Sequence, residues 1–444
     1  MRIRLVGVLG VLIVAWLGAP CSAAAPELPD HRLTLEECIS LARQYNPSLV
    51  TARQDVVQGE ANLDRARASY YPSAVRIGTS GRTGGSSFVE TAAGTIAFST
   101  SDIRREAEVV LSQTIWETGR RESLAGAGHS LMASRASEQS AVQNLLLSIS
   151  QLYYAGLAAE QLVGVSEATL AAARDHEKLA RARAEVGEGA RIDVVPAEAN
   201  VAGAEFSLLQ AGNNADIAKA RLKSEMGVPP TYRLQLAQPD PAQDRGDLPS
   251  LETALEIALA HRPDAIAVRE SVAAAEQSLR LAEAVKDATI SLSAQYERGI
   301  TGPREGTSWA AILSATAFLF DAGSRTANVA AARAQVESTR AWEQQVVNAI
   351  GLEVEVALLD VQTARKSVEA AAKAAAAAEA QLAAAEGKYR EGLGIFVEIL
   401  DAQNTVARAR TDQVQARYTY QTALVALKKA LGQLAPGPAD EAVR

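Results

Sequence analysis

Cysteine and histidine are scarce in this sequence. Two cysteines and four histidines among 444 residues exclude a disulfide scaffold and a clustered structural zinc site. A basic excess is also missing: 44 Lys and Arg against 52 Asp and Glu give a formal charge of −8, so we expect no nucleic-acid binding. Because a P-loop, a dinucleotide fingerprint and a G-x-S-x-G motif are all absent, we expect neither an enzyme nor a bound cofactor or metal.

Aromatic residues are few, and long apolar runs are missing beyond the N-terminus. Aromatic residues make up 5% of the chain and apolar residues 48%, which is typical of long packed helices rather than of aromatic-cored sheets. After the first 25 residues, no stretch approaches the roughly 18 uncharged apolar residues of a membrane-spanning helix. Any insertion of this part into a membrane would therefore have to use β-strands.

The N-terminus has the pattern of a secretory signal peptide. Arg2 and Arg4 precede the apolar run Leu5–Leu17, and small residues follow it. We therefore predict that residues 1–24 are a signal peptide. Cys21 raises the alternative of a lipoprotein, although the proline before it disfavours acylation.

The rest of the sequence repeats itself. Three pairs of segments align in the same order: Thr34–Pro47 with Ser250–Pro263, Ile115–Arg121 with Leu319–Arg325, and Val186–Asp193 with Glu391–Glu398. A shared order of motifs, with insertions between them, predicts two homologous halves. The predicted units are a first repeat at 25–228, a Pro-rich linker at 229–249, a second repeat at 250–432 and a tail at 433–444.

Two long gaps between prolines predict two long helices. No proline lies in 73–195 or in 304–435. Within both gaps, small and apolar residues recur every three or four positions, which predicts coiled-coil packing. We expect helices over about 117–185 and 322–388, each about 100 Å long at about 1.5 Å per residue.

Before each long helix the sequence alternates between apolar and polar residues. We predict four strands, at about 73–82, 104–116, 288–298 and 308–320, with a long Gly-, Ser- and Thr-rich loop at Gly81–Ser101. Strands with one apolar and one polar face suit a membrane β-barrel, and a small exposed sheet on a helical rod is the alternative. Because four strands cannot close a barrel, a barrel would need several chains.

Three features carry a family resemblance. The first is the pair of similar segments at the start of each half, which end in Asn46-Pro47 and in Arg262-Pro263. The others are the corner Phe320–Arg325 and the segment Tyr389–Gln403. With these features the chain resembles the TolC-type outer-membrane efflux proteins over about 33–432. The resemblance implies a mainly α-helical homotrimer in the cell outer membrane. Its twelve-stranded β-barrel, with four strands from each chain, lies in outer-membrane lipid and continues as a periplasmic coiled-coil tunnel of twelve helices.

The resemblance also implies a function and partners. Family members are passive conduits for drugs, metals, dyes or proteins, the last by type I secretion. They work with a periplasmic adaptor protein and an inner-membrane transporter. The main alternative is a periplasmic coiled-coil adaptor or structural protein without a barrel, although an adaptor would have one helical hairpin rather than two.

Glycine-containing turns separate each long helix from the next helix. Gly187 and Gly189 in the first half, and Gly392 and Gly394 in the second, predict helix reversals. An ordinary turn between two helices would also explain these glycines. The resemblance implies that the turns additionally meet the adaptor.

Three acidic residues follow these turns. Asp193 comes after the first turn, and Glu398 and Asp401, which share a helix face, come after the second. A solvated acidic face near a helix N-terminus is one interpretation. The resemblance instead implies the constriction, or gate, at the tunnel entrance.

The gate pattern of the family is not matched at every position. The family can have an arginine two residues after the second turn glycine, where this sequence has Gly394, so Arg191 in the first turn is the candidate replacement. Tyr389 is a candidate for hydrogen bonding across the helix pairs, or a core tyrosine with a solvated hydroxyl.

Overall fold

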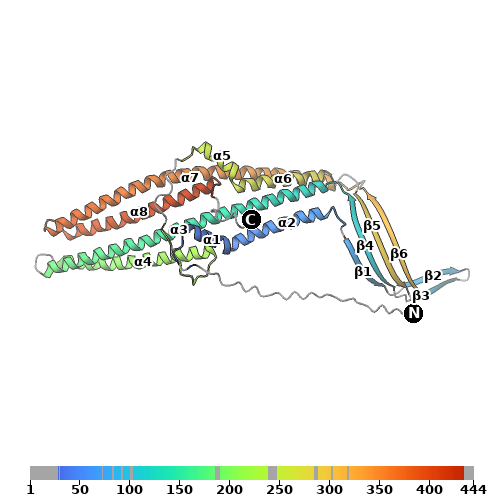
Figure 1. Ribbon diagram of the computed structural model, residues 1–444, viewed down its shortest axis with the longest axis horizontal. Coiled ribbons are helices and arrows are strands. Elements are labelled where there is room, and N and C mark those ends of the chain that lie inside the picture. The colour runs from blue at the N-terminus through green and yellow to red at the C-terminus, as the bar shows by residue number, and fades with distance from the viewer. Residues whose placement is uncertain are drawn as a thin grey trace.

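The chain is elongated, with long helices at one end and strands at the other (Figure 1). The computed structural model describes residues 29, 31–72, 74–82, 85–91, 94–100, 104–185, 191–238, 248–284, 289–301, 304–317 and 320–434. The predicted signal peptide, most of the predicted tail and part of the predicted linker lie outside these residues.

Helices make up most of the described chain, which confirms the mainly α-helical fold class. They are α1 (Leu35–Tyr45), α2 (Pro47–Ala68), α3 (Arg120–Glu185), the short 3-10 helix η1 (Arg191–Asp193), α4 (Val194–Met226), α5 (Leu251–His261), α6 (Pro263–Ala284), α7 (Ser324–Arg390) and α8 (Phe396–Ala430). The two longest, α3 with 66 residues and α7 with 67, occupy the ranges that the proline gaps predict. None of the helices in the described part of the chain is long and apolar enough to cross a membrane.

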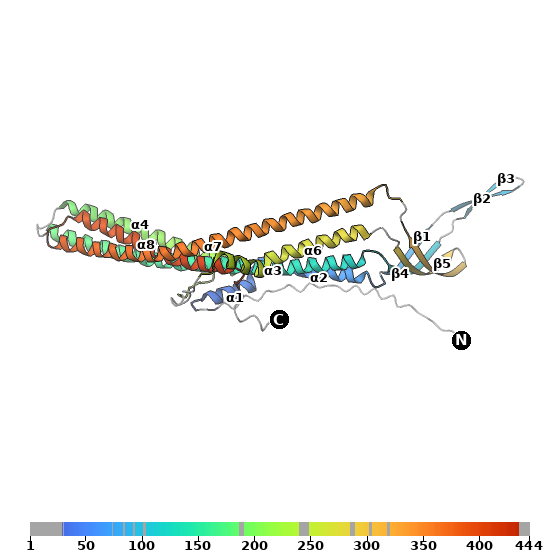
Figure 2. The ribbon, with the colours of Figure 1, turned by 90° about the horizontal axis from the view of Figure 1, so that it is seen from above.

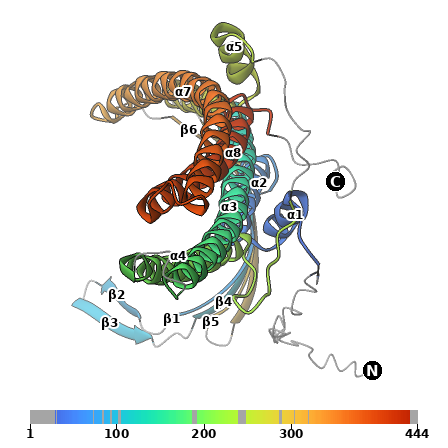
Figure 3. The same ribbon diagram turned by 90° about the vertical axis from the view of Figure 1, so that its left-hand side faces the viewer.

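The long helices pack as two antiparallel hairpins. α3 turns back into α4 and α7 turns back into α8, while α8 also lies against α3. The four helices therefore run side by side in an arc, with α4 and α7 at its two ends (Figure 3). Residues of the predicted seams, such as Ile149 on α3 and Val354 and Val361 on α7, are buried. This burial at three- and four-residue spacing is coiled-coil packing.

Four strands form one antiparallel sheet at the far end of the helices (Figure 2). β1 (Ala74–Arg82), β4 (Arg104–Trp116), β5 (Thr289–Thr301) and β6 (Arg304–Thr316) pair in the order β1-β4-β5-β6. The last strand ends before the predicted residue 320, because the next residues form a corner that caps α7. In that corner the Asp321 carboxylate accepts hydrogen bonds from the backbone N–H groups of Gly323 and Arg325, at 3.2 and 2.8 Å.

The register of the sheet separates apolar from polar residues. Tyr296 of β5 lies opposite Val109 of β4 and Trp309 of β6, and Trp309 is 82% exposed in the single chain. On the other face, Ser293 of β5 lies opposite Ser112 of β4, and Ile312 of β6 is an apolar exception on that face. Residues directly opposite each other in a sheet point to the same side, so the sheet has the apolar face and the polar face that the alternation predicts.

The segment Gly81–Ser101 is not a simple loop, which corrects the prediction. It contains β2 (Gly85–Thr91) and β3 (Gly94–Thr100), which pair as an antiparallel hairpin. Thr, Val, Ile and Phe favour strands, and their contribution outweighs the Gly and Ser content on which the loop prediction relied.

The two corners that precede the second and sixth helices are built alike. Between α1 and α2, the Asn46 side chain donates a hydrogen bond to the carbonyl oxygen of Glu225 at the end of α4 (2.6 Å). Between α5 and α6, the Arg262 guanidinium donates to the carbonyl oxygen of Ala430 at the end of α8 (3.3 Å). Gly227, which follows α4 with φ +72°, is required because a Cβ there would lie 2.5 Å from the carbonyl oxygen of Tyr45. Each corner therefore anchors the end of a returning helix.

Cys38 on α1 is expected to be inert in the folded protein. The residue is fully buried, and burial raises the pKa of its thiol to about 12, so almost no reactive thiolate is present near neutral pH. We expect no reaction with a maleimide in the native state and complete reaction after denaturation. Mass spectrometry of the labelled protein measures both, and native labelling would contradict this burial.

Candidate functional site

The ends of the two long hairpins lie away from the strands (Figure 2), and they carry most of the residues singled out in the sequence. Gly392, with φ +77°, ends α7 in the left-handed conformation. A Cβ at Gly394 would lie 3.1 Å from the Cβ of Lys388, so a larger residue would crowd this turn. Gly187 and Gly189 lie outside the described residues.

Arg183 on α3 joins the first hairpin to the second. Its guanidinium lies over the ring of Tyr389 on α7, 4.7 Å from the ring centroid, and donates a hydrogen bond to the Tyr389 carbonyl oxygen. Tyr389 is buried and also packs against Phe396 at the start of α8, with ring centroids 5.7 Å apart. The link between hairpins therefore uses the ring and backbone of Tyr389, and Arg183 supplies the cation. The side chain of the candidate Arg191 lies outside the described residues.

Asp193 lies at the end of η1 and close to Tyr389. Burial raises the pKa of the Tyr389 hydroxyl, and the negative charge of Asp193 raises it further, against the opposing effect of Arg183. Tyr389 is therefore a neutral phenol near neutral pH, subject to the opposing effects of a cation on α3 and an anion that precedes α4.

Glu398 and Asp401 lie on the first turns of α8, and both are exposed. Among the described residues, neither these two carboxylates nor that of Asp193 forms an ion pair with Lys, Arg or His. The structure thus leaves the three predicted acidic residues uncompensated near the hairpin ends. No three His, Cys, Asp or Glu side chains in the described ranges are grouped as metal ligands.

A second contact between the hairpins involves a buried histidine. His176 on α3 is 8% exposed, and its Nε2 lies 3.5 Å from a carboxylate oxygen of Glu386 on α7. The two residues line a cavity of about 330 Å³ together with Asp175, Arg390 and Ile399, among others. Burial lowers the pKa of His176, although Glu386 and Asp175 oppose this shift. The imidazole is therefore mainly neutral at pH 7, and the seam carries no strong charge pair there.

A buried amide makes the third contact between the hairpins. Gln403 on α8 donates from Nε2 to the carbonyl oxygen of Thr169 on α3 (3.2 Å). Its Oε1 accepts a hydrogen bond from Asn200 on α4 (3.2 Å). Gln403 lies two residues beyond Asp401, so the helix that carries the acidic residues is tied directly to both helices of the first hairpin.

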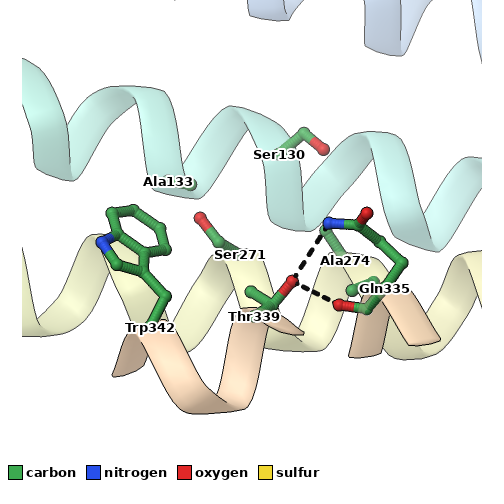
Figure 4. Close-up of a pocket in the computed structure, with 8 residues that line it drawn as sticks. Ser130, Ala133, Ser271, Ala274, Gln335, Thr339 and Trp342 are labelled. Carbon is green, nitrogen blue, oxygen red and sulfur yellow. Dashed lines mark hydrogen bonds between the residues drawn. The ribbon is translucent and has the colours of Figure 1, made fainter. Parts of the chain in front are cut away.

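A separate cavity lies on the strand side of the molecule, among α3, α6 and α7 (Figure 4). It has a volume of about 420 Å³, and Trp342 of α7 extends across it towards α3. Thr339 donates to the Gln335 carbonyl oxygen at 2.8 Å, so its hydroxyl proton is already engaged. The lining has no charged side chain. This cavity therefore has neither the charge nor the location of the acidic site.

Sequence reasoning missed three of these residues. Arg183 and His176 lie in regular helical sequence outside any motif, and Gln403 ends the segment Tyr389–Gln403 but was not singled out there as a site residue. A polar residue within an otherwise apolar seam was the available signal for His176 and Gln403, because such residues need partners when buried. Arg183 had no such signal, since it is one of several charged residues near the end of α3.

Comparison with known proteins agrees with this architecture. The family described as "Outer membrane efflux protein" matches residues 38–228 and 254–433. "Protein CyaE" of Bordetella pertussis is 29% identical over 435 residues, covering 96% of this chain and 89% of that protein. "Pyoverdine export outer membrane protein OpmQ" of Pseudomonas putida is 23% identical over 451 residues, covering 96% and 92%. Among solved structures, the outer-membrane channel OprN has a TM-score of 0.78 at 22% identity, with 90% of each chain covered.

The chain thus shares the fold of an outer-membrane channel protein of known structure. With most of its length matched, the chain belongs to the outer membrane efflux protein family. Its location is accordingly the cell outer membrane, with the helical hairpins forming a periplasmic helical tunnel. Family membership sets aside the alternative of a periplasmic adaptor, and the two hairpins agree with that conclusion.

Proposed function

We propose that three copies of the chain form one passive conduit from the periplasm to the outside. The observation that supports this most strongly is the pair of open edges in the sheet. Within the described chain, β1 pairs only with β4 and β6 only with β5. Unpaired backbone groups are not tolerated in lipid, so β6 of one copy is expected to pair with β1 of the next. Three such sheets close a barrel of twelve strands.

The helices support the same closure. α4 and α7 lie at opposite ends of the arc of four helices, as β1 and β6 lie at opposite edges of the sheet (Figure 3). Three arcs would complete a tunnel of twelve helices. The two similar corners and the shared order of helices and strands agree with two homologous halves, at 25–228 and 250–432.

The acidic residues fit a gate at the periplasmic entrance of this tunnel. Among the described residues, Glu398, Asp401 and Asp193 form no ion pair with a cation, and they lie near the hairpin ends, where a ring of three copies would bring them together. Arg183, Tyr389 and Gln403 would hold the second hairpin against the first and so keep this entrance narrow.

The exposed turns fit docking of a periplasmic adaptor, which would connect the conduit to an inner-membrane transporter. Ile192 of the first turn is 77% exposed, and Leu393 of the second is 78% exposed. Ile395 and Val397 add to this apolar surface. Apolar residues at the tips of two hairpins suit contact with the apolar tip of another helical hairpin.

The proposed trimer can be tested by measuring the molar mass of the purified protein. We expect detergent-extracted protein to have three times the mass of one chain in multi-angle light scattering, and to remain trimeric in SDS until it is heated. Both results follow from barrel closure by backbone hydrogen bonds, which detergent does not compete for. A stable monomer at the same protein concentration would contradict the shared barrel.

A further inference from the structure

His176 lies in the middle of the seam between the two hairpins of one chain. Three contacts with the second hairpin lie along α3 at seven-residue intervals, at Thr169, His176 and Arg183. Seven residues make about two turns of an α-helix, so the contacts share one face of α3 and are about 10 Å apart. The two outer contacts are hydrogen bonds, whereas the middle contact is not.

The imidazole of His176 is buried without a hydrogen bond at Nε2. This nitrogen has no hydrogen-bond partner among the described residues. Its distance of 3.5 Å to a carboxylate oxygen of Glu386 exceeds the roughly 2.7–3.2 Å of an ordinary N–H···O bond. The other carboxylate oxygen of Glu386 pairs with Arg390, one turn further along α7, at 3.4 Å. A buried polar atom without a partner lowers stability, so this contact is a weak point of the seam.

The helices are also loosely packed at this point, because the cavity of about 330 Å³ lies beside the imidazole. The charged groups in its lining are Asp175 of α3 and Glu386 and Arg390 of α7, while α8 contributes Ile399 and α4 contributes no lining residue. Asp175 also forms an ion pair with Lys178 on its own helix, at 3.2 Å. Atoms that line a cavity have fewer neighbours, so little packing is lost when the helices separate here.

A proton on His176 acts against the closed seam. Burial removes water from the imidazolium, and this effect exceeds the attraction of Glu386 and Asp175, so the pKa of His176 lies below its ordinary value of about 6.5. A group whose pKa is lowered in one conformation binds its proton more readily where water reaches it. Protonation therefore favours a conformation in which α3 and α7 are further apart at this point, and the effect grows as the pH falls below about 6.5.

We propose that His176 is an acid-sensitive switch in this seam, neutral while the hairpins are in contact and protonated when they separate. Acidification of the periplasm then loosens α7 from α3 beside the entrance and widens it. The hydrogen bonds made by Arg183 and Gln403 do not titrate in this pH range, so the proton shifts an equilibrium between a closed and a separated seam. The inference rests on the conduit proposed above, because it adds a regulation to the same entrance.

Hydrogen exchange measures the separation of the seam directly. The full-length protein in detergent is compared with His176→Gln at about pH 7.5 and about pH 5.5, one unit on either side of the ordinary pKa of histidine. Mass spectrometry follows the peptides that cover 165–183 and 386–403. Comparison of two proteins at the same pH cancels the intrinsic pH dependence of exchange. At the lower pH we expect these peptides to exchange about two- to tenfold faster in the wild type, because a solvated histidine gains at most about tenfold from protonation there.

Three further variants separate titration from packing. His129→Gln is the matched control, because His129 also lies on α3 and contacts a carboxylate of another helix, Glu270 of α6, at 2.7 Å. It lies about thirteen turns from His176, so this variant should keep the wild-type pH dependence in the seam peptides. His176→Leu, which also lacks a titrating group, should behave like His176→Gln. Glu386→Gln removes a charge that favours the imidazolium, so it should enlarge the acid effect.

Planar-bilayer recordings distinguish failure of the switch from failure of the conduit. The open probability should rise on acidification in the wild type and rise less in His176→Gln, while the carboxylates at the entrance titrate alike in both proteins. Equal exchange of the seam peptides in wild type and His176→Gln at both pH values would overturn the switch and leave the conduit untouched. A pH response in exchange without any channel conductance would mean that the switch stands and the proposed conduit is wrong.

Discussion

Replacement of Arg262 by methionine is expected to lower the free energy of unfolding by about 3 kcal/mol. Arg262 occupies the corner between α5 and α6, and its side chain is 4% exposed. It donates to both carboxylate oxygens of Asp264, at 3.0 and 2.7 Å, and forms an ion pair with Glu353 of α7 at 2.7 Å. Removal of the guanidinium would leave these partly buried acids without their shared cation.

The expected loss lies at the lower end of the range for a broken buried ion pair. The side chains of Asp264 and Glu353 are 35% and 37% exposed, so water takes up part of the lost interaction. Glu353 also keeps its ion pair with Lys429 of α8, at 2.7 Å. Methionine fills much of the volume of the arginine stem, which limits any cavity.

The pH dependence of stability gives a second readout. Burial alone would raise the pKa of Asp264 and of Glu353, but the hydrogen bonds and positive charge of Arg262, together with the charge of Lys429, lower both below their ordinary values. A carboxylate with a lowered pKa in the folded state stabilises the protein above its unfolded-state pKa of about 4. This stabilisation is lost as the pH falls from about 4 through the lowered folded-state pKa values of the two carboxylates. The loss should be smaller in the Arg262→Met variant.

Thermal unfolding followed by circular dichroism at fixed protein concentration measures these effects. The matched control is Arg269→Met, which removes one positive charge from an exposed position on α6 and should change stability by less than about 0.5 kcal/mol. Equal melting temperatures for the two variants would show that the corner does not depend on its ion pairs.

The long helices were predictable because their signals are local and repeated. A gap without proline and a three- and four-residue spacing over many turns allow few alternatives, and α7 indeed buries Ile350, Val354 and Val361 along one side. The strands were also predictable, because alternation at Ile290–Tyr296 distinguishes one face of a sheet from the other. The hairpin at β2 and β3 was missed because its Gly and Ser content resembles that of a loop.

The contacts between the hairpins could not be read from the sequence. Arg183 and Tyr389 are far apart in the chain, and their contact depends on the alignment of α3 with α7. The same holds for Gln403 and Thr169. Local patterns predict which face of a helix is buried, but not which polar residue on the neighbouring helix it meets. The acidic residues were identifiable only because they follow the turns and resemble the family pattern.

Those acidic residues should control the passage and binding of cations. Three copies would gather nine carboxylates at one entrance, since Asp193, Glu398 and Asp401 each occur once in every chain. Closely spaced carboxylates attract cations, and oxygen ligands suit hard multivalent ions, which would plug a narrow opening. The attraction acts over about one Debye length, roughly 8 Å at physiological salt, so it requires a tight constriction.

Replacement of Glu398 and Asp401 by alanine in the same chain is expected to weaken block by a trivalent cation at least about tenfold, which corresponds to about 1.4 kcal/mol. Selectivity for cations over anions should fall as well. Asp193→Ala should act in the same direction but more weakly, because it removes one carboxylate per chain instead of two. Planar-bilayer recordings of the purified channel measure both block and reversal potential.

Two controls separate charge from packing in this experiment. Glu398→Gln with Asp401→Asn keeps the side-chain size and should reproduce the alanine result, since only the charge is lost. Glu205→Gln on α4 removes a carboxylate that Arg174 already neutralises at 2.7 Å, and it should leave block unchanged. Unaltered block in the alanine variant would mean that Glu398 and Asp401 are only a solvated face of α8. In that case the entrance would be narrowed by the contacts of Arg183, Tyr389 and Gln403 rather than by charge.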